Sequence, residues 1–292
     1  SEPGAAMLPA SAALGGMIVP AAIYFGLNAG DTVALRGWAI PIATDIVLVL
    51  GVLSLFSGRV DPAVIAFATA AAIFDDLGAV AIIALFYGEL HQLWPLWMVA
   101  GGLAGLILLN RTRWPSLVPY LAFGCILWAG FVLSGVEGAI AGAIVGFSLP
   151  LSSLPSKTVA AAERRISPFA LLLVVPLFTF FNGGVVLDFV PADPQARSVA
   201  IGIAMALIVG KPLGILAGTL LALRLGIGTL PHGTSMRDAI GVALLAGIGF
   251  TMSLFIIGAD FDVTPIARTA KLAVVSSSAV AALLGLIAFK IR

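Results

Sequence analysis

Apolar stretches long enough to cross a bilayer as helices recur along this chain, separated by short polar segments. Several of the stretches are short, or contain Gly, Pro or charged residues near their middle. The pattern predicts about ten transmembrane helices. The predicted spans cover residues 5–27, 38–56, 63–87, 95–109, 117–133, 138–149, 168–187, 199–223, 239–258 and 272–289.

Composition agrees with an all-α polytopic membrane protein. The 292 residues are 61% hydrophobic and 10% charged, with a mean hydropathy of +1.14, whereas soluble domains carry about 25% charged residues. A soluble chain of this length could not bury so much apolar surface. The net charge of +1 indicates no nucleic-acid partner, so membrane lipid is the expected surrounding, and the single Cys125 excludes an internal disulfide framework.

The charges between the predicted spans indicate an orientation. With ten spans, both termini lie on one side, and ten basic residues fall on that side against four on the other. Because basic residues are enriched in cytoplasmic loops, we expect both termini to be cytoplasmic. The ten residues are Arg59, Arg111, Arg113, Lys157, Arg164, Arg165, Arg224, Arg237, Lys290 and Arg292.

Two predicted spans are interrupted near their middle. The span 38–56 contains Asp45 after a proline, and the span 239–258 contains Gly249 and Thr251. Each is the middle member of a set of three spans, one at either end of the chain. Corresponding members are seven positions apart in the order of spans, as the second and the ninth are, so the two sets have opposite orientations. Interrupted helices at matching positions of inverted repeats favour a substrate site near the midplane, where the two helices cross.

This arrangement gives the expected domain organisation. The whole chain, 1–292, is predicted to be a single transmembrane transporter domain. Within it, 1–87 and 199–292 form the inverted-repeat core, and 95–187 supplies intervening helices.

Four ionisable residues are predicted at membrane depth: Asp45, Asp75, Asp76 and Lys211. Unpaired, they would cost roughly 10 kcal/mol together on insertion scales. We therefore expect them to face the bundle interior or a water-filled cavity and to compensate one another.

Asp75 and Asp76 are adjacent, in the middle of the span 63–87. A carboxylate at this depth can hold a proton or a small hard cation, but not both, and this competition can couple the two fluxes. Neighbouring helical residues point about 100° apart, so we expect one to face Lys211 and the other an open cavity. The competing interpretation is that both are neutral structural acids. It is weaker, because a second adjacent carboxylate adds nothing to the structure that one would not.

The remaining groups would complete the site. Asp45 would neutralise facing helix N-termini, while Lys211 would neutralise helix C-termini or pair with Asp75. The hydroxyls of Thr44 and Thr251 would offer oxygens to a dehydrated cation. Purely structural roles stay open for Asp45, as a buried hydrogen-bonded carboxylate, and for Lys211, as a counter-ion.

Two other function classes compete with a transporter. An intramembrane aspartyl protease would use two Asp residues from different helices, such as Asp45 and Asp76, but the expected Gly-x-Gly-Asp context is missing and Lys211 would have no role. A passive cation channel would need a ring of donors around a continuous pore.

Four segments resemble the bacterial NhaA-type sodium/proton antiporters, in the same order along the chain. Inverted repeats are an established feature of that family, so they and the resemblance are not independent indications. The segments are 37–46 (GWAIPIATDI), 74–79 (FDDLGA), 210–214 (GKPLG) and 247–253 (GIGFTMS).

The resemblance implies export of Na⁺ or Li⁺ in exchange for H⁺, with more protons than sodium moved per cycle and no enzymatic activity or cofactor. It makes Asp75 and Asp76 the ion and proton site, with Asp76 as the main sodium ligand and Lys211 as the partner of Asp75. It places Asp45 and Thr44 in the crossed interrupted helices.

The resemblance also implies a location in the bacterial inner membrane and a response to pH. Glu163 matches a position that the family associates with cytoplasmic pH response, and Glu137 stands where the family often has a histidine, which would shift that response. Family members have two more helices before the point where this chain begins, joined by a hairpin used in dimerisation. We therefore expect a chain shortened at its N-terminus. Such a chain would lack the hairpin through which the family forms its homodimer.

Overall fold

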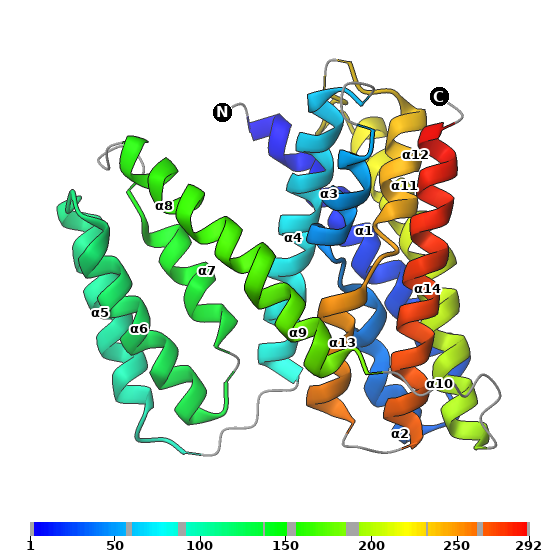
Figure 1. Ribbon diagram of the computed structural model, residues 1–292, viewed down its shortest axis with the longest axis horizontal. Helices are drawn as coiled ribbons and strands as arrows, with labels where there is room; N and C mark the ends of the chain where they lie inside the picture. Colours follow the sequence, from blue (N-terminus) through cyan, green and yellow to red (C-terminus); the bar gives the residue numbers. More distant parts are fainter. Residues whose placement is uncertain are drawn as a thin grey trace. The chain divides into compact units, whose positions relative to one another are not determined.

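The computed structural model describes residues 3–56, 60–86, 92–136, 138–150, 156–184, 193–231, 233–261 and 265–290. Within these ranges every regular element is a helix (Figure 1). By length and composition, seven described segments could cross a membrane, or eight if the bent pair 32–42 and 46–54 counts as one span. The chain is therefore an all-helical, multi-pass membrane protein.

Two of the ten predicted spans are shorter in the structure than a bilayer requires. They correspond to α5 (Leu96–Thr112), with 17 residues, and α7 (Ala139–Ser148), with 10 residues. A helix needs about 20 apolar residues to cross the hydrocarbon core. That α5 and α7 each cross the membrane stays a prediction.

The helices form two compact units, residues 1–79 with 178–292 and residues 80–177. Within the first unit, α1 begins and α14 ends at the same end (Figure 1). The elements of this unit are α1 (Pro3–Asn28), α2 (Thr32–Arg36), η1 (Gly37–Ile42), α3 (Ile46–Ser54), most of α4 (Pro62–Phe86), α10 (Pro194–Met205), η3 (Ala206–Gly210), α11 (Lys211–Arg224), α12 (Met236–Leu245), α13 (Phe250–Asp260) and α14 (Pro265–Lys290).

Helices α1 and α11 approach each other at backbone distance. A Cβ atom at Gly15 would lie 2.1 Å from the carbonyl oxygen of Gly214, and one at Gly218 would lie 2.1 Å from that of Ser11. Only glycine fits at such a crossing, which is the small-residue packing typical of membrane helices. The contact fixes α11, and with it Lys211 at its start, against α1.

A π-helical turn, η3, joins α10 to α11. Pro212 has no N–H, and its ring would clash with the carbonyl four residues earlier in a regular α-helix. The chain relieves this with one wider turn, in which the N–H of Lys211 donates to the carbonyl of Ala206. The proline beside Lys211 is thus accommodated by a π turn within one long span, 194–224.

The two predicted interruptions are present. The 3₁₀ helix η1 contains Pro41 and ends at Ile42, and α3 restarts at Ile46 at an angle of 42°. Helix α12 ends at Leu245, and α13 restarts at Phe250 after a segment that contains Gly247 and Gly249.

The second unit packs α5 against α6 over glycines. Gly102 and Gly105 of α5 face Leu127 and Phe123 of α6, and Tyr120 is buried with its hydroxyl donating to the carbonyl of Leu109 at 2.8 Å. The further elements of this unit are α6 (Leu117–Ser134), α7, α8 (Ser156–Phe169), the π turn η2 (Ala170–Val174) and the start of α9 (Val175–Asn182).

Candidate functional site

Asp75 lies in the middle of α4 and forms an ion pair with Lys211. The lysine ammonium donates to both carboxylate oxygens, at 2.7 and 2.8 Å. Both residues are buried, with 3% and 0% of their surfaces exposed. Charges removed from water to this extent persist only when they are paired and hydrogen-bonded.

Lys211 also contacts the broken helix η1–α3. Its ammonium donates to the carbonyl of Ile42, the last residue of η1. The C-terminal end of a helix carries a partial negative charge on unpaired carbonyls, which a cation stabilises. One ammonium thus meets both partners that the sequence suggested for it, the Asp75 carboxylate and a helix C-terminus.

The Asp45 carboxylate joins the starts of two half-helices. Its Oδ1 accepts from the N–H of Leu48 in α3, and its Oδ2 accepts from the N–H of Thr251 in α13, both at 3.0 Å. Asp45 is only 2% exposed. A single buried negative charge therefore compensates two positive helix N-termini that face each other.

The carbonyl ends at the same crossing are capped by neighbouring groups. The Thr44 hydroxyl donates to the carbonyl of Ala246 at 3.0 Å, and the Asp45 N–H donates to that of Ile248 at 2.6 Å. The Ser253 hydroxyl donates to the carbonyl of Ile40 at 2.6 Å. These bonds satisfy backbone groups that the two interruptions would otherwise leave unpaired in a medium without water.

Sequence reasoning assigned no role to Ser253 or to the Ile42 carbonyl. Ser253 carries a hydroxyl in an apolar segment, four residues after Gly249. Its position one helical turn after this glycine was the only indication in the sequence that it lies at the site. A backbone carbonyl gives no signal in a sequence at all.

Gly249 and Thr251 lie at the start of α13. A Cβ atom at Gly249 would lie 2.5 Å from the Ser253 hydroxyl and 3.1 Å from the Ala43 carbonyl oxygen, so the glycine allows the two broken helices to touch. Thr251 contacts Asp45 through its backbone N–H; a role for its hydroxyl stays a prediction.

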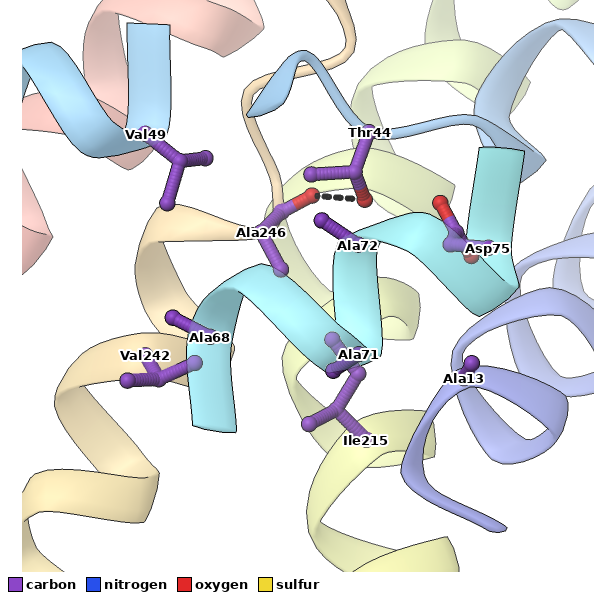
Figure 2. Close-up of a pocket in the computed structure, with 10 residues that line it drawn as sticks. All are labelled: Ala13, Thr44, Val49, Ala68, Ala71, Ala72, Asp75, Ile215, Val242 and Ala246. Carbon is purple, nitrogen blue, oxygen red and sulfur yellow. Dashed lines mark hydrogen bonds between the residues drawn. The ribbon is translucent and has the colours of Figure 1, made fainter. Parts of the chain in front are cut away.

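A pocket of about 320 Å³, part of it open to the surroundings, reaches Asp75 and Thr44. Figure 2 shows these two residues among the lining side chains and the Thr44 hydroxyl bonded to Ala246. The other lining side chains are small or aliphatic and come from five helices: Ala13, Val49, Ala68, Ala71, Ala72, Ile215, Val242 and Ala246.

The sequence predicted that one acid of the pair would face Lys211 and the other an open cavity. Asp75 both pairs with Lys211 and lines the pocket, whereas Asp76 does neither. Asp76 is partly buried, and its Oδ1 is buried without a hydrogen-bond partner among the described residues. Adjacency predicted that the two would diverge, but not that one of them would take both contacts.

The remaining predicted residues cannot be placed at the site. Glu137 and the side chain of Glu163 lie outside the described residues. In the described part of the chain, no three His, Cys, Asp or Glu side chains converge as they would around a tightly held metal ion.

Comparison with known proteins gives a consistent result. The family described as Na⁺/H⁺ antiporter 1 matches residues 1–289. An Na⁺/H⁺ antiporter NhaA from Mannheimia succiniciproducens is 40% identical over 98% of this chain and 75% of its own length. Similar proteins of the same name from Bordetella parapertussis and Rhodospirillum rubrum are 42% and 40% identical, over 96% and 100% of this chain and 72% and 76% of theirs. Relatives with these names are transporters rather than enzymes. The chain therefore belongs to the Na⁺/H⁺ antiporter 1 family.

Proposed function

We propose that this chain is a secondary antiporter that exchanges Na⁺, or Li⁺, for H⁺ across a membrane. Family membership supports the reaction. The observation that carries the assignment to particular residues is the buried pair of adjacent carboxylates on α4, one of them neutralised by Lys211 and open to a pocket. A protease would have no use for that lysine.

Competition at the carboxylates would couple the two ions. Asp76 keeps one buried oxygen that accepts from no donor in the described part of the chain, so it is the acid best suited to accept either a proton or Na⁺. A carboxylate that has taken a proton no longer offers full negative charge to Na⁺. If the site faces one side of the membrane at a time, this exclusion suffices for exchange.

The Lys211 ammonium has a second acceptor besides Asp75, and this allows it to act as a counter-charge that moves when Na⁺ binds. Na⁺ arriving at Asp75 would displace the ammonium from the carboxylate, yet the ammonium would keep its bond to the Ile42 carbonyl. The Thr44 hydroxyl oxygen, beside Asp75 in the pocket, would replace part of the hydration of the ion. Asp45, bound to two helix N-termini, would hold the crossing together and compensate its charge.

The finer architecture follows the same proposal. We assign ten spans, with 1–87 and 199–292 as an inverted-repeat core and 95–187 as intervening helices, and both termini in the cytoplasm of a bacterium whose inner membrane holds the protein. The crossing of two broken helices and the excess of basic residues on one side support this.

Regulation and assembly rest on the resemblance alone. Glu163 and Glu137 would tune the response to pH, membrane lipid would surround the helices, and a homodimer is the assembly to test first. No cofactor is needed for exchange.

The proposal is tested with purified protein in proteoliposomes, with the membrane potential clamped near zero by K⁺ and valinomycin. An outward Na⁺ gradient should drive protons inward against their own gradient, and Asp75→Asn or Asp76→Asn should abolish this. Asp193→Asn is the matched control, because Asp193 caps α10, away from the pocket lining. Proton movement that never runs uphill would indicate a channel, and activity in both site variants would contradict the residue assignment.

A further inference from the structure

The pocket at Asp75 ends where α1 and α4 come into contact. The two helices run in the same direction (Figure 1). Ala13 of α1 and Ala72 of α4 line the pocket together with Asp75. One helical turn further along, Met17 is four residues after Ala13 on α1, and Gly78 is three residues after Asp75 on α4.

The side chain of Met17 rests directly on Gly78. A Cβ atom at Gly78 would lie 2.4 Å from the sulfur and 2.7 Å from the terminal methyl carbon of Met17. Any side chain at position 78 would therefore displace the thioether. The glycine forms a notch in α4, and the methionine fills it.

Lys211 lies close to the contact between Met17 and Gly78. A Cβ atom at Gly16, the residue before Met17, would meet the Ile215 side chain at 2.7 Å and the Lys211 Cε at 3.8 Å. Helix α1 thus borders the ion pair from one side and presents Met17 just beyond it. The α4 residues that line the pocket, from Ala68 to Asp75, all lie on the N-terminal side of Gly78, where Met17 contacts the helix.

We infer that Met17 is a gate residue, whose thioether on Gly78 closes the ion site toward the C-terminal end of α4, the end away from the pocket. This inference rests on the proposed exchange of Na⁺ and H⁺ at Asp75 and Asp76. An ion would leave on the closed side only after the thioether moves off Gly78. Methionine suits this task because it is unbranched, apolar and rotates about three bonds.

The first test removes the gate and measures leakage. In proteoliposomes, Met17→Ala should raise the Na⁺ and H⁺ leak that continues without an opposing ion by roughly tenfold or more, the effect of a barrier lowered by about 1.4 kcal/mol. Met17→Leu, which keeps the bulk, should leak little. Met7→Ala is the matched control, since Met7 lies on the same helix with an exposed side chain.

A second variant changes the residue on α4 that Met17 contacts. Gly78→Ala adds one carbon that must push the flexible thioether aside, so it should also leak, and Gly51→Ala should not, because a Cβ atom at Gly51 meets nothing within 4 Å. This variant keeps the inference testable even if Met17→Ala does not fold.

Thiol labelling reports the gate without relying on transport. In a Cys125→Ser background, Ala79→Cys places a thiol beside Gly78 on α4, where Ala79 is fully buried. A membrane-impermeant thiol reagent added from the side of the α4 C-terminus should label it at least roughly tenfold faster when Met17 is Ala, a factor that corresponds to about 1.4 kcal/mol.

The outcomes separate the two proposals. If the unmodified protein does not exchange Na⁺ for H⁺, the proposed function fails. If it exchanges normally, but Met17→Ala and Gly78→Ala neither leak nor expose the thiol at position 79, Met17 is only a packing residue and the gate is refuted.

Discussion

At the scale of single residues, one ammonium group connects the parts of the site. Lys211 binds the Asp75 carboxylate on α4 and the Ile42 carbonyl at the end of η1. It is completely buried, so it reaches both acceptors inside the protein. Its loss therefore removes a positive charge from a carboxylate and from a carbonyl at once.

Lys211→Met should lower the free energy of unfolding by about 3 to 5 kcal/mol, because it leaves the buried Asp75 carboxylate without its counter-charge. Adding Asp75→Leu should restore most of that loss, since an apolar pair replaces the ion pair. Thermal or denaturant unfolding in detergent measures both. A double variant no more stable than Lys211→Met would show that the pair does not act as a unit.

Sequence reasoning performed unevenly at this scale. It located Asp45, Asp75, Asp76 and Lys211, because any ionisable residue inside an apolar stretch is conspicuous. It did not indicate that Asp75 would both pair with Lys211 and line the pocket, because the rotation of α4 about its axis is set by packing that a single sequence does not reveal. Contacts such as that of Met17 with Gly78 depend on the approach of two helices and were likewise not predictable.

At the scale of elements, the two broken helices stabilise each other. Each interruption exposes N–H groups and carbonyls, and the two sets satisfy one another through Asp45, Thr44 and Ser253. The breaks themselves were predictable, because Pro41 and the glycines around position 248 are local signals. The π turn before Pro212 was not, since a proline in a helix can be accommodated by a kink, a break or a wider turn.

Asp45→Ala should destabilise the protein by about 2 to 4 kcal/mol, the loss of two caps of about 1 to 2 kcal/mol each. Asp45→Asn should cost less, because its single amide oxygen still accepts from one N–H group. Unfolding in detergent measures the difference, with Asp193→Ala as control, since Asp193 caps α10 alone. Equal losses at the two positions would show that Asp45 does not bridge α3 and α13.

At the scale of the whole molecule, hydropathy alone predicted a helical, multi-pass membrane protein, because continuous apolar stretches of about 20 residues cross a bilayer as helices that satisfy their own backbone. The number of crossings was less predictable: α5 and α7 are shorter than a bilayer requires. A short helix can still cross with its neighbours or in a locally thinned bilayer, so length cannot decide the count.

The whole account requires that Na⁺ and H⁺ exclude each other at one buried site. Both ions would occupy the carboxylates of Asp75 and Asp76, which lie side by side on α4. Each Na⁺ that binds must then expel protons. Because fewer protons compete as the pH rises, the apparent affinity for Na⁺ must improve with pH.

Proton release on addition of Na⁺ to the purified protein in weakly buffered detergent solution tests this most directly. We expect protons to appear in the medium as Na⁺ binds, with an apparent affinity that strengthens as the pH rises, and no release from Asp76→Asn. Calorimetric binding of Na⁺ that releases no protons, or an affinity that stays flat with pH, would contradict the account.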